Sequence, residues 1–248
     1  MPLKTFTLAE RPEREDEFEG FAEAGWPRFL RQRDELGSGR LWPELFTTFD
    51  RFQLLLFDGD RVVGVGHAVP IAWDGSPATL PDSLAGILEN AVATRAGGHR
   101  ATALAAMAVI SAGHEAQGYR SDLVRAMRGL ALQHGLDALV APVRPELKAA
   151  YPLAPLERYV RWTQPDGAPL DPWIRVHWRL GAEIARVAPR TLSIAGTVAQ
   201  WEEWTGMAFP DSGPYVVPGA LQPVSIDRER DEGRYEDPNV WMLQDVRS

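Results

Sequence analysis

The sequence predicts an α/β fold in which a mixed central sheet carries helices on both faces and a C-terminal extension follows. Three observations support this prediction. Residues 104–110 and 138–143 are short, continuous apolar runs, which is typical of buried strands. Residues 121–135 lie between them and repeat apolar side chains at helical spacing. Residues 52–73 form two further apolar runs around an Asp-Gly turn, which is typical of a β-hairpin.

The first seventy residues supply the antiparallel part of the predicted sheet. Residues 4–10 alternate enough to form a first strand, and residues 15–35 predict one or two helices around a break at Pro27. Residues 52–57 and 61–73 then form the hairpin, whose glycine permits the positive φ of a tight turn. We expect an insertion at about residues 74–100, made of a loop, a helix with Asp82 as its N-cap, and a second loop.

The middle of the chain reads as a strand, a helix and a second strand. Ser121 is a good N-cap for the helix, and Gly135 is a good residue to end it. This order predicts two parallel strands joined by a right-handed crossover. Pro142 has no N–H to donate to a sheet, so the second strand must lack a partner on one side at that position.

The remaining elements are shorter. We predict a helix over residues 153–162, and a second over residues 171–182 with Asp171 as N-cap and Gly181 as its end. Residues 183–188 and 190–196 resemble a hairpin turning at Pro189. A short helix and two short strands then precede a Trp-containing end. No linker is long enough to separate two folding units, so we expect a domain over residues 1–196 and an extension over 197–248 packed on it.

Composition excludes several classes of function. The 248 residues are 45% hydrophobic and 24% charged, as expected of a globular protein. The net charge of -8 disfavours nucleic acid as a partner. With no Cys there is no disulfide, thiolate nucleophile or Cys-ligated metal. No secretory signal and no run of about 18 apolar residues is found, so we expect no membrane span and a cytoplasmic location.

Familiar catalytic motifs are absent. There is no G-x-S-x-G elbow and no phosphate-binding G-x-x-x-x-G-K-[ST]. Residues 114–118 begin like the zinc motif H-E-x-x-H, but Gly118 stands where the second ligand would be, so we predict no metal site. Gly64 and Gly66 imitate a dinucleotide fingerprint, yet they lie inside a hairpin strand rather than at a strand-to-helix turn.

The loop at residues 111–120 joins a buried strand to a helix N-terminus. Unpaired backbone N–H groups and the positive end of the helix dipole make such a place suitable for a phosphate. Gly118 would allow close backbone approach, and the Arg120 guanidinium could add a charged contact. The alternative is an ordinary strand-to-helix connection capped by Ser121.

The order of these elements over residues 3–196 resembles the GNAT superfamily of acyl-CoA-dependent N-acyltransferases. The family signature, Q/R-x-x-G-x-G/A, aligns with residues 115–120. Gly118 fits the glycine of that signature, whereas Glu115 and Arg120 depart from it. A register that starts at Gln117 gains the first position and loses the glycine.

The resemblance implies where the co-substrate, acetyl-CoA or another acyl-CoA, would bind. The strands at 104–110 and 138–143 would splay apart and admit the pantetheine arm, which agrees with Pro142. The residues whose backbone would bind the pantetheine amides are Met107, Ala108, Val109 and Ile110. The residues whose N–H groups would hold the pyrophosphate are Gln117, Gly118, Tyr119, Arg120 and Ser121.

The resemblance also implies a general acid. Many relatives place a Tyr four residues before the helix-ending glycine, and His177 stands at that position here. Imidazole can serve as an acid near neutral pH, although a His on this apolar helix face could equally be a packed core residue. The strand at 104–110 contains no carboxylate to act as base. His67, Asp74 and Glu89 are candidates, each with a structural alternative, and a water relay is a further option.

The sequence therefore predicts an enzyme that moves an acetyl or other acyl group from acyl-CoA to an amine of a small molecule or protein. The alternative is a GNAT-fold protein that has lost catalysis and serves as a ligand-binding or regulatory module; a hydrolase or other transferase is a third reading. The aromatic residues of the extension could cover the acceptor site, form the contact of a homodimer, or pack as an extra layer.

Overall fold

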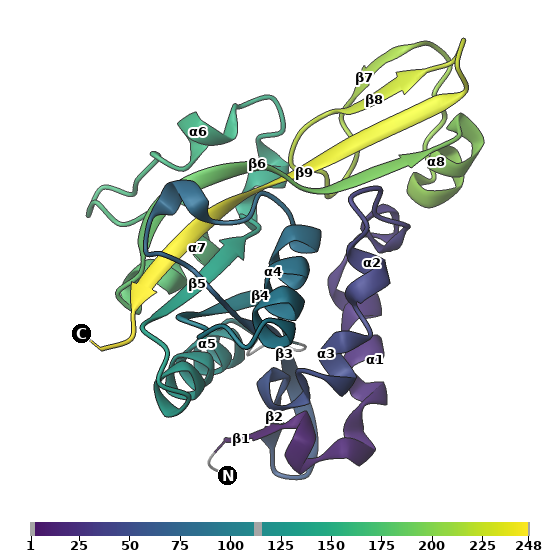
Figure 1. Cartoon of the computed structure of the whole chain (residues 1–248). Coiled ribbons are helices and arrows are strands. Elements are labelled where there is room, and N and C mark those ends of the chain that lie inside the picture. The colour runs from purple at the N-terminus through teal and green to yellow at the C-terminus, as the bar shows by residue number, and fades with distance from the viewer. Residues whose placement is uncertain (1–2, 112–115, 248) are drawn as a thin grey trace.

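The computed structural model describes residues 3–111 and 116–247. Its centre is one mixed sheet of nine strands in the order β1-β2-β3-β4-β5-β9-β8-β7, and β6 pairs with β9 (Figure 1). Helices cover both faces of this sheet, so the predicted α/β class is confirmed. No helix in the described ranges is both long enough and apolar enough to cross a bilayer.

The elements have the following bounds. The strands are β1 (Lys4–Thr7), β2 (Leu54–Asp58), β3 (Arg61–Ile71), β4 (Ala103–Ser111), β5 (Ala138–Val143), β6 (Glu183–Gly196), β7 (Gly213–Tyr215), β8 (Val224–Asp227) and β9 (Glu232–Asp245). The α-helices are α1 (Asp16–Gly25), α2 (Ser38–Leu41), α3 (Glu44–Thr47), α4 (Leu84–Ala96), α5 (Ala116–Gln133), α6 (Leu156–Tyr159), α7 (Pro172–Arg179) and α8 (Val198–Thr205).

β4 and β5 are parallel but paired over only part of their length. Their register runs from Ala103 opposite Ala138 to Ala105 opposite Val140, although β4 continues to Ser111 and β5 to Val143. Pro142 lies beyond the paired part and is matched with Trp241 of β9 on its other side. The expected loss of a partner at Pro142 is therefore confirmed.

Different helices cover the two faces of the sheet. On one face, α5 packs Leu123 and Met127 against a cluster that includes Ala141 of β5 and Ile174 of α7. On the other face, α4 packs Leu84, Ile87 and Leu88 against a cluster that includes Met107, Val140 and Trp241. Because side chains alternate along a strand, neighbouring residues of β5 and β9 face these two layers in turn.

Several local predictions differ from the structure. The predicted hairpin around Pro189 is instead a single strand, β6, because β9 pairs with both halves of it. The register shifts between Ala188 and Leu192, and such a bulge accommodates the missing N–H of Pro189. Helix α5 begins at Ala116 rather than at Ser121, and the N-cap of α4 is Ser83 rather than Asp82. The helix predicted over residues 153–162 is reduced to α6.

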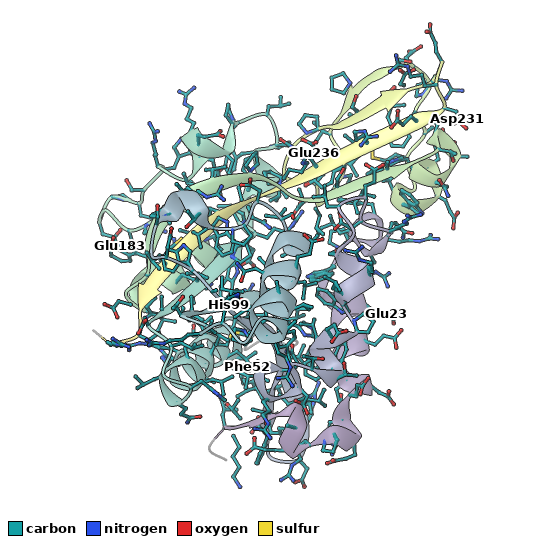
Figure 2. The ribbon with its side chains drawn as sticks, viewed as in Figure 1. Glu23, Phe52, His99, Glu183, Asp231 and Glu236 are labelled. Carbon is teal, nitrogen blue, oxygen red and sulfur yellow. The ribbon has the colours of Figure 1, made fainter. Side chains whose placement is uncertain are left out.

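The C-terminal part of the chain contributes a strand to the middle of the sheet. β9 lies between β5 and β8 and also pairs with β6. Asp231 marks the outer tip of this long ladder, and Glu183 lies near its opposite end (Figure 2). Residues 197–248 therefore complete the sheet that residues 1–196 begin, while the division at residue 196 stays a prediction.

Two glycines allow aromatic side chains to cover the outer end of the ladder. Gly233 of β9 pairs with Gly196 of β6. A Cβ at Gly196 would lie 2.5 Å from Cη2 of Trp204, and a Cβ at Gly233 would overlap the indole of Trp201. Trp201 is fully buried in a cluster with Phe29 and Tyr235, so its ring has no space into which to retreat.

We expect Gly233→Ala to destabilise the protein by about 1–3 kcal/mol or more, because overpacking a filled core displaces side chains and backbone. Urea unfolding measures this change. Gly129→Ala is the matched control, since Gly129 lies inside α5 with open space at its Cβ; this substitution should raise stability by roughly 1 kcal/mol through helix propensity. Equal effects of the two substitutions would contradict the packing argument.

His67 is buried in an aromatic cluster away from solvent. The ring centroid lies 5.0 Å from that of Phe18 and 5.2 Å from that of Trp42. Its Nδ1 lies 3.0 Å from Gln53 Oε1. Gln53 Nε2 donates to the carbonyl oxygens of Phe49 and Ala68, so Oε1 is an acceptor and Nδ1 carries the proton. Burial lowers the pKa of His67 from 6.5 to about 4, and the ring is neutral at pH 7.

This burial predicts a loss of stability in acid. The unfolded state takes up a proton near pH 6.5 and the folded state only near pH 4, so the free energy of unfolding falls as the pH falls through that window. His67 should contribute a slope of up to about 1.4 kcal/mol per pH unit. Urea unfolding at pH values from 7 to 4.5 should show that the free energy of unfolding depends less steeply on pH in His67→Leu than in the wild type. Parallel pH dependences for the two proteins would contradict the role of His67.

Candidate functional site

The gap between β4 and β5 forms a narrow cleft in the sheet. Residues 106–109 of β4 and residues 141–143 of β5 line its walls. Trp173 and His177 of α7 line it from the α5 face, and Leu84 of α4 lines it from the α4 face. β4 pairs with β3 along its other edge, so the backbone on the cleft side of β4 beyond Ala105 pairs with no strand in the described residues.

The structure places the predicted pantetheine residues in two environments. Met107, Ala108 and Val109 line the cleft. Ile110 lies on the same strand, but its side chain packs in a separate cluster with Phe18 and Val65. Because successive residues of a strand direct their N–H and C=O groups to opposite edges, alternate residues within 107–109 can offer backbone groups to an amide in the cleft.

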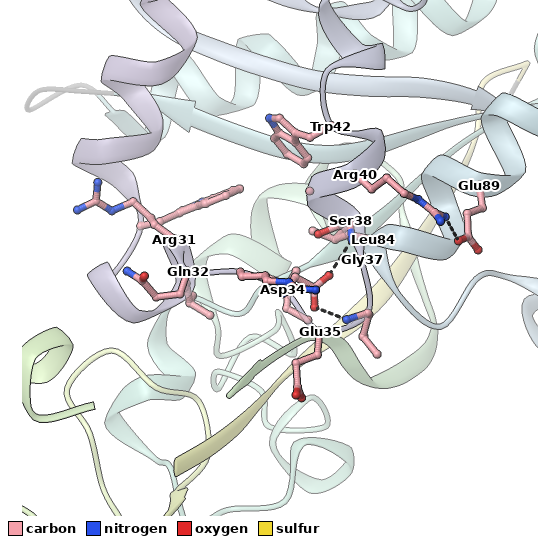
Figure 3. A pocket seen from close by; sticks show the side chains of 16 residues that line it. Arg31, Gln32, Asp34, Glu35, Gly37, Ser38, Arg40, Trp42, Leu84 and Glu89 are labelled. Atoms are coloured by element: carbon pink, nitrogen blue, oxygen red, sulfur yellow. Dashed lines mark hydrogen bonds and ion pairs between the residues drawn. The ribbon is translucent and has the colours of Figure 1, made fainter. Parts of the chain in front are cut away.

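A wider pocket lies beside the cleft on the α4 face (Figure 3). It has a volume of about 680 Å³ and is lined mainly by residues 30–40, with Trp26, Trp42 and Glu89. We call it the outer pocket. The side chains that line both the outer pocket and the cleft are Trp26, Leu30, Leu84 and Leu192. The outer pocket and the cleft therefore adjoin each other, with these four side chains at their common boundary.

Charged groups of both signs surround the outer pocket. Asp34 is buried and accepts hydrogen bonds from the backbone N–H groups of Leu36 and Ser38 (Figure 3). It also accepts from the N–H of Ser193 on β6, which fixes the loop. Glu89 of α4 pairs with Arg40 at 3.2 Å. Glu35 accepts from Arg234 at 2.5 Å. The Asp34 carboxylate thus supports the loop. The ion pairs of Glu89 with Arg40 and of Glu35 with Arg234 are more exposed, so a solute can reach them.

The N-terminus of α5 lies after the end of β4. Gln117 and Gly118 belong to its first turn, whose N–H groups have no partner within the helix. Gly118 is exposed, and nothing lies within 4 Å of a Cβ built on it. Tyr119, Arg120 and Ser121 come next along the helix, so Ser121 is not its cap. Glu115, the first residue of the aligned signature, lies outside the described residues.

Arg120 extends from α5 towards α7. Its guanidinium carbon lies 5.1 Å from the centroid of the Trp173 ring, and Nη2 donates to Glu146 Oε2 at 3.1 Å. Its Nε is buried and has no hydrogen-bond partner among the described residues. The side chain is 18% exposed, so this cation lies partly covered near the mouth of the cleft.

His177 projects from α7 into the cleft. Asp171 caps this helix by accepting from the N–H groups of Trp173 and Ile174. The imidazole packs edge-on against Trp173, with centroids 4.6 Å apart. It is 4% exposed, and Nε2 has no hydrogen-bond partner in the described part of the chain. Burial lowers the pKa of His177 to about 4, so the ring is neutral at pH 7.

None of the three candidate bases lines the cleft. His67 is enclosed by aromatic rings and bonded to Gln53. Asp74 is exposed, and hydrogen bonds from Thr79 and the Ser76 backbone hold its pKa below the ordinary value. Glu89 lines the outer pocket. The structure therefore separates these candidates from His177.

Sequence reasoning missed a buried polar group on β9. Asp237 is 1% exposed, lines the cleft, and accepts from Tyr235 at 2.6 Å and from Arg144 at 3.0 Å. Burial opposes the charge of Arg144, but attraction to Asp237 raises the pKa of Arg144 above its usual range. Asn239, two residues further on, also lines the cleft. No local pattern marks this face in the sequence, because Asp237 and Asn239 reach the cleft only through the insertion of β9 between β5 and β8.

No protein-family model matches the chain. An arginine N-acetyltransferase, avaD, from Aspergillus versicolor is 32% identical over 251 residues, covering 89% of this chain and 85% of that protein. The chain belongs to the GNAT superfamily of acyl-CoA-dependent N-acyltransferases.

Solved structures agree on the fold. The loading GNATL domain of CurA from Lyngbya majuscula has a TM-score of 0.60 and 14% identity, covering 99% of this chain and 98% of that one. The GphF GNAT-like decarboxylase, solved with isobutyryl-CoA, has a TM-score of 0.56 and 19% identity, covering 99% and 100%. The fold and family expected from the sequence are thus confirmed.

Proposed function

We propose that the protein transfers an acyl group, with acetyl as the first candidate, from acyl-CoA to the amine of a small molecule. The observation that carries this proposal is the cleft between β4 and β5, which places an unpaired strand edge next to the outer pocket. A thioester arm in the cleft would expose its carbonyl carbon to an amine that arrives from the outer pocket. Family membership and the arginine N-acetyltransferase relative support the same reaction.

The residues present fit an acyl-CoA. Amides of a pantetheine arm would pair with the cleft-facing backbone groups within Met107, Ala108 and Val109, as a neighbouring strand would. We assign its diphosphate to the first turn of α5, at Gln117 and Gly118, where helix N–H groups and the helix dipole favour an anion. Arg120 could add a contact by exchanging Glu146 for a phosphate.

His177 fits a role at the departing sulfur. The neutral ring can carry its proton on Nε2 and donate it as a hydrogen bond to the thioester sulfur, where negative charge develops as the C–S bond breaks. The negative charge that develops on the sulfur would in turn raise the pKa of the His177 ring. The proton lost by the attacking amine ends on the sulfur, so the products are an amide and the free thiol.

The outer pocket is suited to an amine that carries further charge. Trp26 and Trp42 present aromatic surface, and Glu35, Glu89 and Arg40 supply both signs of charge. An amino acid with a cationic side chain matches this set, because its carboxylate and its cation each meet an opposite charge. The activity named for the Aspergillus relative makes L-arginine the first acceptor to test.

One observation favours the non-catalytic alternative. Arg120 already has Glu146 and the Trp173 ring as partners near the mouth of the cleft. These partners occupy the guanidinium that a diphosphate would otherwise use, and a ligand-binding role without acyl transfer would rest on that contact. A cytoplasmic location, a protein acceptor and a homodimer stay predictions from the sequence.

We expect acetyl-CoA to raise the melting temperature, because a ligand that binds only the folded state stabilises it. Gly118→Glu should abolish that rise, since a carboxylate in the first turn of α5 repels a diphosphate. Differential scanning fluorimetry measures both. Release of free CoA in the presence of L-arginine and a panel of other amines then tests turnover. No shift with any acyl-CoA would remove the basis of the enzyme proposal.

We expect His177→Phe to lower kcat by roughly 100-fold or more, because removing one positioned hydrogen-bond donor at a site of developing charge costs about 10²–10³-fold, while the shift in melting temperature caused by acetyl-CoA persists. Because the pKa of His177 is about 4, the rate should show no titration from this ring between pH 5 and pH 8. Stopped assays of CoA release over this range provide the measurement. An undiminished rate in the variant would reduce His177 to a packing residue.

A further inference from the structure

Asn239 carries an unpaired hydrogen-bond acceptor beside the cleft. It lies on β9 opposite Ala188, and its side chain is 5% exposed. Its Oδ1 is buried and accepts no hydrogen bond from the described residues. Buried polar atoms are nearly always paired, because removal from water without a replacement bond costs free energy. An unpaired oxygen at a substrate cleft therefore indicates a donor that arrives with a substrate.

The neighbours of Asn239 determine which way its amide faces. Thr191 Oγ1 donates to the carbonyl oxygen of Asp237 at 2.9 Å. The hydroxyl has a single proton, so towards Asn239 it can only accept. Nδ2 of Asn239 is therefore the atom that faces Thr191, at 2.5 Å. The reverse orientation would set two acceptors against each other, so Oδ1 is left as the free end of the amide.

Asn239 and His177 reach the cleft from opposite faces of the sheet. Asn239 and Trp241 share one face of β9 because they are two residues apart, and Trp241 packs in the cluster of α4 with Leu84. His177 belongs to α7, on the α5 face. The outer pocket meets the cleft on the α4 face, through Leu84 and Leu192. The donor that pairs with Asn239 is thus expected from the outer pocket.

We propose that Oδ1 of Asn239 accepts a hydrogen bond from the N–H of the acceptor amine and directs its lone pair at the thioester carbon. This inference rests on the proposed acyl transfer. A neutral primary amine has two N–H groups and one lone pair, so holding one N–H restricts where the lone pair points. The C–N bond forms as the C–S bond breaks, and the proton lost by nitrogen passes to the sulfur. Asn239 itself gains and loses no proton.

The neighbouring carboxylate is less suited to this task. Asp237 accepts from both Tyr235 and Arg144, so its oxygens are already used by the protein. If Asp237 turned towards a substrate, its ion pair with Arg144 would weaken, which is costly because the Asp237 carboxylate is buried. Asn239 is available without that cost.

The test compares Asn239→Ala and Asn239→Asp with the wild type, using acetyl-CoA and L-arginine. For Asn239→Ala we expect kcat/KM for L-arginine to fall about 100-fold, as for a misplaced reactant, while the affinity for acetyl-CoA changes by less than about twofold. For Asn239→Asp we expect the acidic limb of the pH profile for kcat/KM to move to higher pH, because a carboxylate stabilises the unreactive ammonium form.

Gln244→Ala is the matched control. Gln244 is a buried amide on the same strand, it bonds to the Leu180 carbonyl oxygen, and it does not line the cleft. Its substitution should lower the melting temperature and leave kcat/KM for L-arginine unchanged. If Asn239→Ala behaves like Gln244→Ala, or weakens acetyl-CoA and L-arginine alike, Asn239 does not hold the amine. A wild-type protein that releases no CoA with any amine would instead overturn the proposed function itself.

Discussion

The short pairing between β4 and β5 is the constraint on which the rest of the site depends. After three matched residues on each strand the ladder stops, and the backbone of both strands continues without pairing to each other. In a closed sheet those groups would satisfy one another. Here they line a cleft, and Pro142 of β5 agrees with the separation because it has no N–H to contribute to a ladder with β4. Both faces of the sheet thereby gain access to one buried space.

The polar side chains around Asp237 of β9 are compatible with this apolar sheet because they form hydrogen bonds with one another. Tyr235 donates to one oxygen of the Asp237 carboxylate and Arg144 Nε donates to both, while Arg144 Nη2 donates to the Gly219 carbonyl oxygen at 2.7 Å. Burial raises the pKa of Tyr235, so its hydroxyl stays a donor. Against this satisfied background, the unpaired Nε2 of His177 and Oδ1 of Asn239 differ from their neighbours. The proposed acyl transfer assigns a substrate partner to each of these two atoms.

Local sequence signals predicted the parts of the fold that depend on neighbours in the chain. The Asp-Gly hairpin, β4, β5 and the Asp171 cap of α7 are where the sequence places them. Pairings between strands that lie far apart in the sequence were harder to predict. The Pro189 turn was wrong because a long partner strand, unseen in the local pattern, holds both halves of β6 in one line. The cleft side of β4 and His177 were reached through resemblance, whereas Asp237 and Asn239 depend on where β9 inserts, which no local pattern reveals.

The position of β9 also has a consequence for synthesis. The ribosome releases the chain from its N-terminus, so β1 to β5 emerge well before residues 232–245. Until those residues appear, the edge of β5 that β9 later pairs with is uncovered, and the cleft lacks the wall that carries Asp237 and Asn239. A nascent chain would therefore expose an unpaired apolar strand edge, which is prone to aggregation, and would have no complete site until β9 is translated.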